Sequence, residues 1–376
     1  MFKYLRMLGV IALSTLAIFG GSAAAQAAPS TVTILTGFHS TAGVAFSLDG
    51  KTAFVVQDDD GTMGGPSSLV VIDTTTLTQV GDAISTGVNG AGVNHSIVMS
   101  PDGTKAYVSL GTGVVKPFYP ATLTFGPAIT VGTAGIGQVV FTPDGLHAYV
   151  AVTNNGSGQY VKVIDVVTDS VTATISACSA PDGLAMTPDG LTVFVNCSDG
   201  SVQVIETTGN TVLTTFTPTG HLQGTMITMA PDGARVYVTA FAIPTTVTTV
   251  IDTTTYTEVH QFTHEPKDVA FTADGTIAYL FSASSGDLVP TDATTFAEGT
   301  PIDVTVPSPG DWFLLDKNPV VDQYWICGGS SIRIVGQGSS LADTGANATG
   351  VTITTLAGTG LIALGLAVTL TRRRRA

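Results

Sequence analysis

The feature that most constrains this chain is a short phrase that returns along it. One copy is Ser100-Pro101-Asp102-Gly103, with alternating apolar residues on both sides. Proline fixes φ for the first central position of a type I turn, aspartate suits the second, and glycine accepts the left-handed conformation that follows. Alternating apolar residues around such a turn indicate a β-hairpin. The phrase therefore predicts two antiparallel strands joined by a tight turn.

The same hairpin recurs at nearly constant spacing. Its turn aspartates are separated by steps of 53, 42, 45, 43 and 42 residues. A period of about 40–45 residues is typical of four-stranded blades arranged around a common axis. A further step of 42 residues reaches Asp316, which indicates a degenerate seventh hairpin around Lys317-Asn318-Pro319. The six clear turn aspartates are Asp49, Asp102, Asp144, Asp189, Asp232 and Asp274.

The two ends of the repeat region are each incomplete, and together they would form one four-stranded blade. The seventh repeat has a hairpin and a third strand at 331–335 but no fourth strand, whereas residues 31–36 alternate like a strand that has no partner nearby. Closing a ring removes exposed sheet edges. We therefore predict an all-β fold, a seven-bladed β-propeller over residues 28–336 that is closed by its N-terminal strand.

The strand that follows each turn carries a resemblance to a known family. Three copies after Pro-Asp-Gly read Ala106-Tyr107-Val108-Ser109, Ala148-Tyr149-Val150-Ala151 and Val236-Tyr237-Val238-Thr239. They resemble the YVTN-type (YncE-like) family of seven-bladed β-propellers, over residues 31–336. The resemblance implies the architecture. It implies no single activity, because propellers host adhesion, scaffolding, lactone hydrolysis and redox chemistry alike.

Residues 1–27 have the three parts of a secretory signal peptide. Lys3 and Arg6 form the charged end, residues 8–19 the apolar core, and Ala25-Gln26-Ala27 a small-residue cleavage site. The alternative is a permanent membrane anchor, but the apolar run is short for a bilayer span. We expect export and removal of this segment.

The other end of the chain predicts membrane insertion. A linker at 337–350 precedes residues 351–371, which carry no charge, and residues 372–376 contain four arginines. About 20 uncharged residues can cross a bilayer as a helix, and arginines favour the cytoplasmic side. We therefore predict a C-terminal transmembrane helix followed by a basic cytoplasmic tail.

The linker also contains the pentapeptide 341–345. The order pentapeptide, apolar span, basic tail resembles the cell-wall sorting signal of Gram-positive bacteria, and Leu-Ala-x-Thr-Gly resembles its actinobacterial variant. The resemblance implies that a sortase cleaves between Thr344 and Gly345 and joins Thr344 to peptidoglycan. It places the protein in the membrane before sorting and at the cell wall afterwards. The alternative is a plain transmembrane anchor. The motif residues are Leu341, Ala342, Asp343, Thr344 and Gly345.

The net charge of the chain limits the classes of partner that it can bind. Between the two terminal segments the chain holds eight basic and 28 acidic residues, a net charge of −20. Such a surface repels nucleic acid and anionic lipid and favours cations or neutral partners. We expect a monomeric propeller that does not bind nucleic acid and whose partner at the surface is unidentified.

Two groups of residues are candidates for metal binding. Histidines lie 10, 11, 10 and seven residues before their turn aspartates, in loops at one face of the ring, where imidazoles could bind a transition metal or move protons. A run of three aspartates in the first blade could hold calcium. The alternatives are hydrated polar loops, so no cofactor is firmly predicted. The residues are His39, His221, His264 and His95, and Asp58, Asp59 and Asp60.

The three cysteines are an odd number for an exported protein. Cys178 and Cys197 fall at the same face of the fourth blade, which makes them candidates for a structural disulfide. Cys327 falls in the seventh blade, far around the ring, and we expect it to be unpaired.

Motifs for catalysis are missing from the chain. It has no Gly-x-Ser-x-Gly elbow, P-loop, dinucleotide-binding glycine motif or His-Glu-x-x-His. The prediction is a surface-displayed binding or interaction module. A channel-mouth enzyme (a lactonase-like hydrolase or a metal-dependent oxidoreductase) and a structural cell-wall protein remain alternatives. Histidines and carboxylates converging on the channel would favour an enzyme, whereas a channel of small and apolar residues would favour binding.

Overall fold

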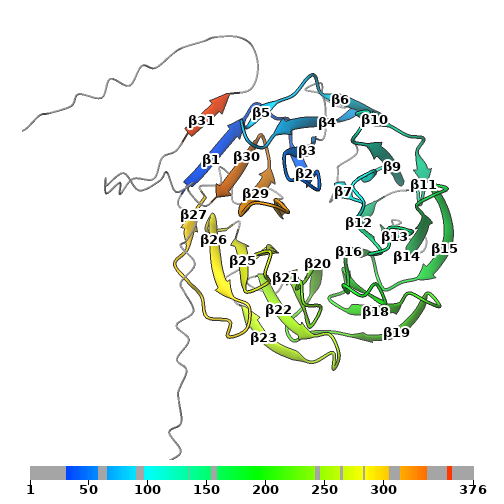
Figure 1. Ribbon diagram of the computed structural model, residues 1–376. Helices are drawn as coiled ribbons and strands as arrows, with labels where there is room; N and C mark the ends of the chain where they lie inside the picture. Colours follow the sequence, from blue (N-terminus) through cyan, green and yellow to red (C-terminus); the bar gives the residue numbers. More distant parts are fainter. Residues whose placement is uncertain are drawn as a thin grey trace, which may run out of the picture.

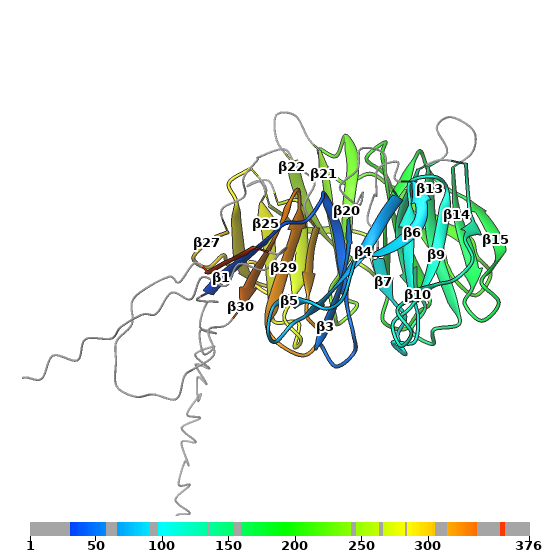
Figure 2. The same cartoon turned by 90° about the horizontal axis from the view of Figure 1, so that it is seen from above.

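The protein folds into a ring of seven β-sheets around a central channel (Figure 1). Seen edge-on, the strands cross the thickness of the ring (Figure 2). The predicted all-β, seven-bladed propeller is confirmed. The computed structural model describes residues 31–57, 66–89, 97–133, 135–153, 159–241, 246–262, 266–282, 284–304, 314–336 and 354–357.

Each blade runs outward from the channel in the order of its strands. Blade one comprises β2 (Thr41–Phe46), β3 (Thr52–Gln57), β4 (Pro66–Asp73), β5 (Thr78–Gln79) and β6 (Ile84–Asn89). Blade two comprises β7 (Ile97–Met99), β8 (Ala106–Leu110), β9 (Val114–Tyr119), β10 (Thr124–Phe125) and β11 (Ile129–Thr130). Blade three comprises β12 (Ile136–Phe141), β13 (His147–Thr153), β14 (Gln159–Asp165) and β15 (Ser170–Ser176).

The remaining blades follow the same plan. Blade four comprises β16 (Pro181–Met186), β17 (Thr192–Cys197), β18 (Val202–Glu206) and β19 (Thr211–Phe216). Blade five comprises β20 (Gln223–Met229), β21 (Arg235–Phe241), β22 (Thr246–Asp252) and β23 (Glu258–Phe262). Blade six comprises β24 (Asp268–Phe271), β25 (Ile277–Ser282), β26 (Asp287–Asp292) and β27 (Ile302–Asp303), and blade seven β28 (Leu314–Lys317), β29 (Gln323–Gly328), β30 (Ser331–Gly336) and β1 (Thr31–Thr36).

The repeated turns have the predicted chemistry. In blade three the Gly145 N–H donates to the Thr142 carbonyl at 2.8 Å, and Gly145 has φ of +70°. The Thr142 hydroxyl donates to Asp144 Oδ1 at 2.6 Å. Each turn also packs on the turn of the preceding blade, since a Cβ added at Gly190 would lie 2.7 Å from Cδ of Pro143. Glycine is therefore needed there both for its positive φ and for the close approach.

The hydrophobic core is divided among the blade boundaries. Seven clusters of buried residues fill the seven spaces between neighbouring blades. The alternation of the second strand produces this arrangement, because successive side chains point to opposite faces of a sheet. In β8, Ala106 and Val108 pack against blade one, and Tyr107 packs against blade three.

The N-terminal strand closes the ring as predicted. Strand β1 pairs antiparallel with β30, from Thr31 opposite Gly336 to Thr36 opposite Ser331. Its Val32 packs toward blade six and its Leu35 toward blade one. The other edge of β1 pairs in parallel with β31 (Thr354–Ala357).

The register of blade seven corrects one expectation from the spacing. The Asn318 N–H donates to the Gln323 carbonyl, as the Thr272 N–H donates to the Ile277 carbonyl in blade six. Asn318 thus stands where Thr272 stands, and the residues that follow it form the turn. The turn therefore lies slightly later than the predicted Lys317-Asn318-Pro319, and Asp316, which the 42-residue step reaches, lies on β28 and pairs with Trp325.

The predicted terminal segments are largely outside the described residues. These are the signal peptide 1–27, the linker 337–350 and the basic tail 372–376. Of the predicted transmembrane helix 351–371, four residues are described, and these form the extended strand β31. Across the described ranges, we find no helix with the length and apolar character needed to span a membrane.

Candidate functional site

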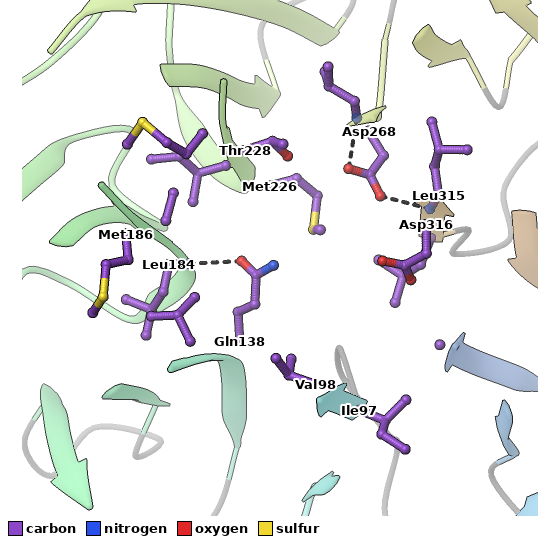
Figure 3. A pocket seen from close by; sticks show the side chains of 17 residues that line it. Ile97, Val98, Gln138, Leu184, Met186, Met226, Thr228, Asp268, Leu315 and Asp316 are labelled. Atoms are coloured by element: carbon purple, nitrogen blue, oxygen red, sulfur yellow. Dashed lines mark hydrogen bonds between the residues drawn. The ribbon is translucent and has the colours of Figure 1, made fainter. Parts of the chain in front are cut away.

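The inner strands of all seven blades surround a cavity of about 280 Å³ in the channel. Strands β2, β7, β12, β16, β20, β24 and β28 each contribute to its wall. Figure 3 shows the labelled side chains of this wall, drawn from every side of the channel except that of β2. Because the whole ring supports the wall, the cavity is held in one shape.

Most of the wall is aliphatic. Ile97, Val98, Val140 and Leu184 form one side, and Met186, Met226 and Met229 add thioethers. The polar side chains on the wall are Gln138, Thr228, Asp268 and Asp316. Among the described residues that line the cavity there is no histidine, lysine or arginine.

One repeat position on the inner strands does not keep its residue type from blade to blade. The position six residues before each turn aspartate is Gly43, Gln138, Gly183, Met226 and Asp268 in blades one, three, four, five and six. Leu314 occupies the corresponding place in blade seven, four residues before Asn318. The turns and second strands repeat their residue types, whereas this position has a different type in almost every blade. The turns and second strands thus repeat around the ring, whereas the side chains on the inner strands differ from blade to blade.

Two of these side chains join neighbouring blades. Gln138 Oε1 accepts a hydrogen bond from the backbone N–H of Leu184 in the next blade at 2.9 Å. Asp268 Oδ2 accepts from the N–H of Leu315 in the next blade at 2.8 Å, and its Oδ1 accepts from the Val269 N–H at 2.8 Å. Asp268 is only 4% exposed. Hydrogen bonds from N–H groups to both oxygens stabilise the ionised form of a buried carboxylate.

Asp316 makes the corresponding hydrogen bond between blade seven and blade one, where the ring closes. Its carboxylate accepts from the N–H of Val44 in blade one. The accessible surface of Asp316 faces the channel, where the surrounding protein replaces bulk water. Burial, together with the charge of Asp268, raises the pKa of Asp316 to about 7, and the Val44 bond opposes this shift only in part. Asp316 therefore changes its charge near neutral pH.

Neither of the two described histidines of the predicted cluster, His39 and His221, lines the cavity. His39 is exposed in the loop before β2, and its backbone N–H donates to Gln57 Oε1. His221 is 5% exposed between blades four and five, and its Nε2 lies 2.9 Å from Thr249 Oγ1. His95 and His264 lie outside the described residues. In the described part of the chain, no group of three or more His, Cys, Asp or Glu side chains is placed to hold a metal ion.

The other predicted positions are distributed as follows. Cys178 and Cys197 are joined by a disulfide, with Cα atoms 6.0 Å apart, and Cys327 is a buried free thiol. The aspartates 58–60 and the motif residues 341–345 lie outside the described residues. The three cysteines do not line the channel cavity.

Sequence reasoning missed Gln138, Met226, Asp268 and Asp316. Three of them share one repeat position, so aligning the six clear repeats on their turn aspartates would have exposed the irregular position. Asp316 could not be found in this way, because the seventh turn has no aspartate to align.

Comparison with known proteins supports the fold alone. No protein-family model matches the chain, and no curated protein matches it. The β-propeller domain of Myceliophteria thermophila Cps50 (Swd1) matches with a TM-score of 0.66 and 12% identity, covering 81% of this chain and 98% of that one. Kuenenia stuttgartiensis hydrazine synthase matches with a TM-score of 0.65 and 15% identity, covering 85% and 99%. At such identities the likeness concerns architecture and carries no function.

Proposed function

We propose that this protein is a sortase-anchored β-propeller of the cell surface that acts as a binding module. The ring holds the channel in a fixed shape, and the linker at 337–350 tethers the ring to the wall. A preformed cavity avoids part of the ordering cost of binding. The ligand enters the channel, and the loops at its mouth contact a larger partner.

The observation that carries the binding role is the character of the channel wall. A largely aliphatic cavity with a few fixed polar groups is the usual form of a small-molecule site. A hydrolase or a metal-dependent oxidoreductase would need a base, nucleophile or metal ligands converging on one point. The described wall offers two carboxylates without a histidine, so binding is favoured over catalysis.

The surface location rests on the two chain ends. A charged start, an apolar core and a small-residue cleavage site predict export. The pentapeptide 341–345, the uncharged span and the four arginines support covalent attachment to peptidoglycan. The high negative charge of the remaining chain suits a hydrated position outside the membrane.

The test is cell fractionation of a Thr344→Ala variant. The Thr344→Ala change keeps the backbone carbonyl but removes the threonine side chain by which the motif is recognised. We therefore expect no transfer to peptidoglycan and a shift of the protein from the wall fraction to the membrane fraction. Thr349→Ala, in the same linker, is the matched control and should remain in the wall fraction. A Thr344→Ala protein that stays covalently bound to the wall would refute the anchoring proposal.

A further inference from the structure

Blade seven carries a fifth strand that the four-stranded plan does not require. Strand β31 lies beyond β1, on the side away from β30 (Figure 1). The pairing is parallel and runs from Thr33 opposite Thr354 to Thr36 opposite Ala357. The outer strands of blades three and four, β15 and β19, end their sheets with no further described strand beside them. Blade seven is therefore covered at the edge where those blades are open.

The outer edge of β1 has the character of a strand that accepts a partner. Its sequence, Thr-Val-Thr-Ile-Leu-Thr, holds five β-branched residues and neither a charge nor a proline, and its register with β30 is continuous. Natural sheets protect their edges with charges, prolines or bulges, because an open edge offers unpaired N–H and C=O groups to other chains. Strand β1 has none of these devices, so its outer edge is open to strand addition wherever no other segment covers it.

The segment around β31 is equally suited to a strand. Residues 351–355 read Val-Thr-Ile-Thr-Thr and are all β-branched. Such side chains fit the pleated surface of a sheet and lose χ1 freedom in a helix. The same residues begin the predicted transmembrane helix 351–371, and a strand paired with β1 and a helix inside a bilayer exclude each other. Residues 354–357 therefore have two alternative positions, on the ring or in the membrane.

The path of the chain brings this segment to β1 rather than to another blade. Strand β30 ends at Gly336, which lies opposite Thr31, and β31 begins opposite Thr33, two residues further along β1. The 17 residues between β30 and β31 (337–353) can reach about 55 Å, whereas neighbouring strands lie about 5 Å apart. A tether of this length keeps the segment at a high effective concentration beside β1. Strands β15 and β19 are also uncharged but have no tethered segment next to them.

We propose that the outer edge of β1 is a strand-addition site, which residues 354–357 cover until sorting removes them. Sorting exchanges the peptide bond between Thr344 and Gly345 for a bond from the Thr344 carbonyl carbon to an amine of the peptidoglycan precursor. Gly345 leaves with a free amino group and carries residues 354–357 away. The anchored ring then offers an uncharged edge to an extended, β-branched segment of a partner, which it binds through backbone hydrogen bonds. This inference rests on the proposed sorting of the chain.

Amide hydrogen exchange, followed by NMR in two wild-type chains, tests the cover. Chain 28–358 contains every described strand, and chain 28–344 is the product of the proposed cleavage. Alternate amides of a strand face opposite neighbours. We expect the amides of residues 33–36 that face away from β30 to exchange at least tenfold more slowly in chain 28–358 than in chain 28–344. The β1 amides that face β30, and the outer amides of β15 and β19, should agree within twofold.

A double-proline variant assigns this protection to β31. Thr355→Pro combined with Leu356→Pro removes two adjacent N–H groups, of which one faces β1 in either register. Exchange in chain 28–358 should then return to the rates of chain 28–344. Ala346→Pro combined with Asn347→Pro, in the linker outside β31, is the matched control and should keep the slow exchange. Both variants leave the sequence of the ring unchanged.

The uncovered edge is probed with a synthetic peptide of residues 351–358. At millimolar concentration it should slow the same outward-facing β1 amides in chain 28–344, whereas the peptide with both prolines should leave them unchanged. This measurement uses the wild-type ring and needs no variant of it.

Each contrary result has its own meaning. Equal exchange of the outward-facing β1 amides in the two chains, or slow exchange that survives the double proline in β31, would overturn the cover. A wild-type peptide that leaves chain 28–344 unchanged would overturn the edge as a strand-addition site. The fractionation of Thr344→Ala decides sorting separately: a variant that stays in the wall would overturn the release of the cover, whereas the exchange data alone decide whether the cover exists.

Discussion

Individual side chains give each blade boundary its own identity. The Tyr107 hydroxyl donates to Asp169 Oδ1 in the next blade at 2.6 Å, and Lys105 also binds this carboxylate. The corresponding Tyr149 donates to Asn210 Oδ1 at 2.7 Å. At the next-but-one boundary Tyr237 packs near Phe296, which offers no acceptor. Similar repeats therefore carry different contacts, which helps to fix the order of blades around the ring.

His221 makes stability depend on pH. Burial lowers its pKa from 6.5 to about 4, so between these values the unfolded chain binds a proton that the folded chain does not. Stability is then lost as pH falls from 6.5 toward 4, by up to about 1.4 kcal/mol per unit. We expect His221→Gln to lose about 2 kcal/mol less than the wild type between pH 7 and pH 4.5.

Urea unfolding at the two pH values measures this difference. His39→Gln replaces an exposed histidine and should follow the wild type. Any cost of losing the bond to Thr249 cancels, because it is present at both pH values. If His221→Gln loses as much stability as the wild type, its imidazole does not carry the acid sensitivity.

Individual residues also differ in how well the sequence predicted their roles. The turn residues were predictable, because Pro, Asp and Gly each fit one conformation of the turn whatever surrounds it. The contacts of the channel residues were not, because Gln138 and Asp268 accept hydrogen bonds from the backbone of the next blade, at Leu184 and Leu315. No local signal in the chain reports that contact.

Strand β1 is the element that completes the molecule. It supplies the outer strand of blade seven from the opposite end of the chain, and its Leu35 is 4% exposed in the cluster shared with blade one. Closure was predictable, because an unpaired strand and a three-stranded blade can each satisfy the other. The exact position of the seventh turn was not, because this turn follows Asn318 and has no aspartate at the spacing of the other repeats.

Shortening Leu35 should weaken the closed ring. We expect Leu35→Ala to cost about 2–5 kcal/mol, the range for a buried leucine whose removal leaves a cavity. Thr33→Ala lies on the same strand outside the fully buried set and should cost less than about 1 kcal/mol. Urea unfolding of chain 28–344 compares the two. Equal stability of Leu35→Ala and wild type would mean that β1 does not contribute to closure.

At the scale of the whole molecule, the turn chemistry gives one face a strong negative charge. The turns between first and second strands lie beside those between third and fourth strands, as the bond from the Thr74 hydroxyl to the Gly50 carbonyl shows. Hydrogen bonds from neighbouring hydroxyl and N–H groups lower the pKa of most carboxylates in both sets, so they stay ionised. These are Asp49, Asp102, Asp144, Asp189 and Asp274, with Asp73, Asp165, Glu206, Asp252 and Asp292.

Concentrating like charges on one rigid face opposes the compact state. Salt screens this repulsion over about 10 Å at 0.1 M, and a net charge of −20 leaves much to screen. We expect the unfolding temperature of chain 28–344 to rise by several degrees between about 10 mM and 0.5 M NaCl, with KCl having the same effect because screening does not distinguish the two cations. A larger rise with CaCl₂ at equal ionic strength would reveal a specific calcium site, for which the aspartates 58–60 are the candidates. A fall in the unfolding temperature with NaCl would mean that attractive ion pairs, such as Lys105 with Asp169, outweigh the repulsion between the two sets of turns.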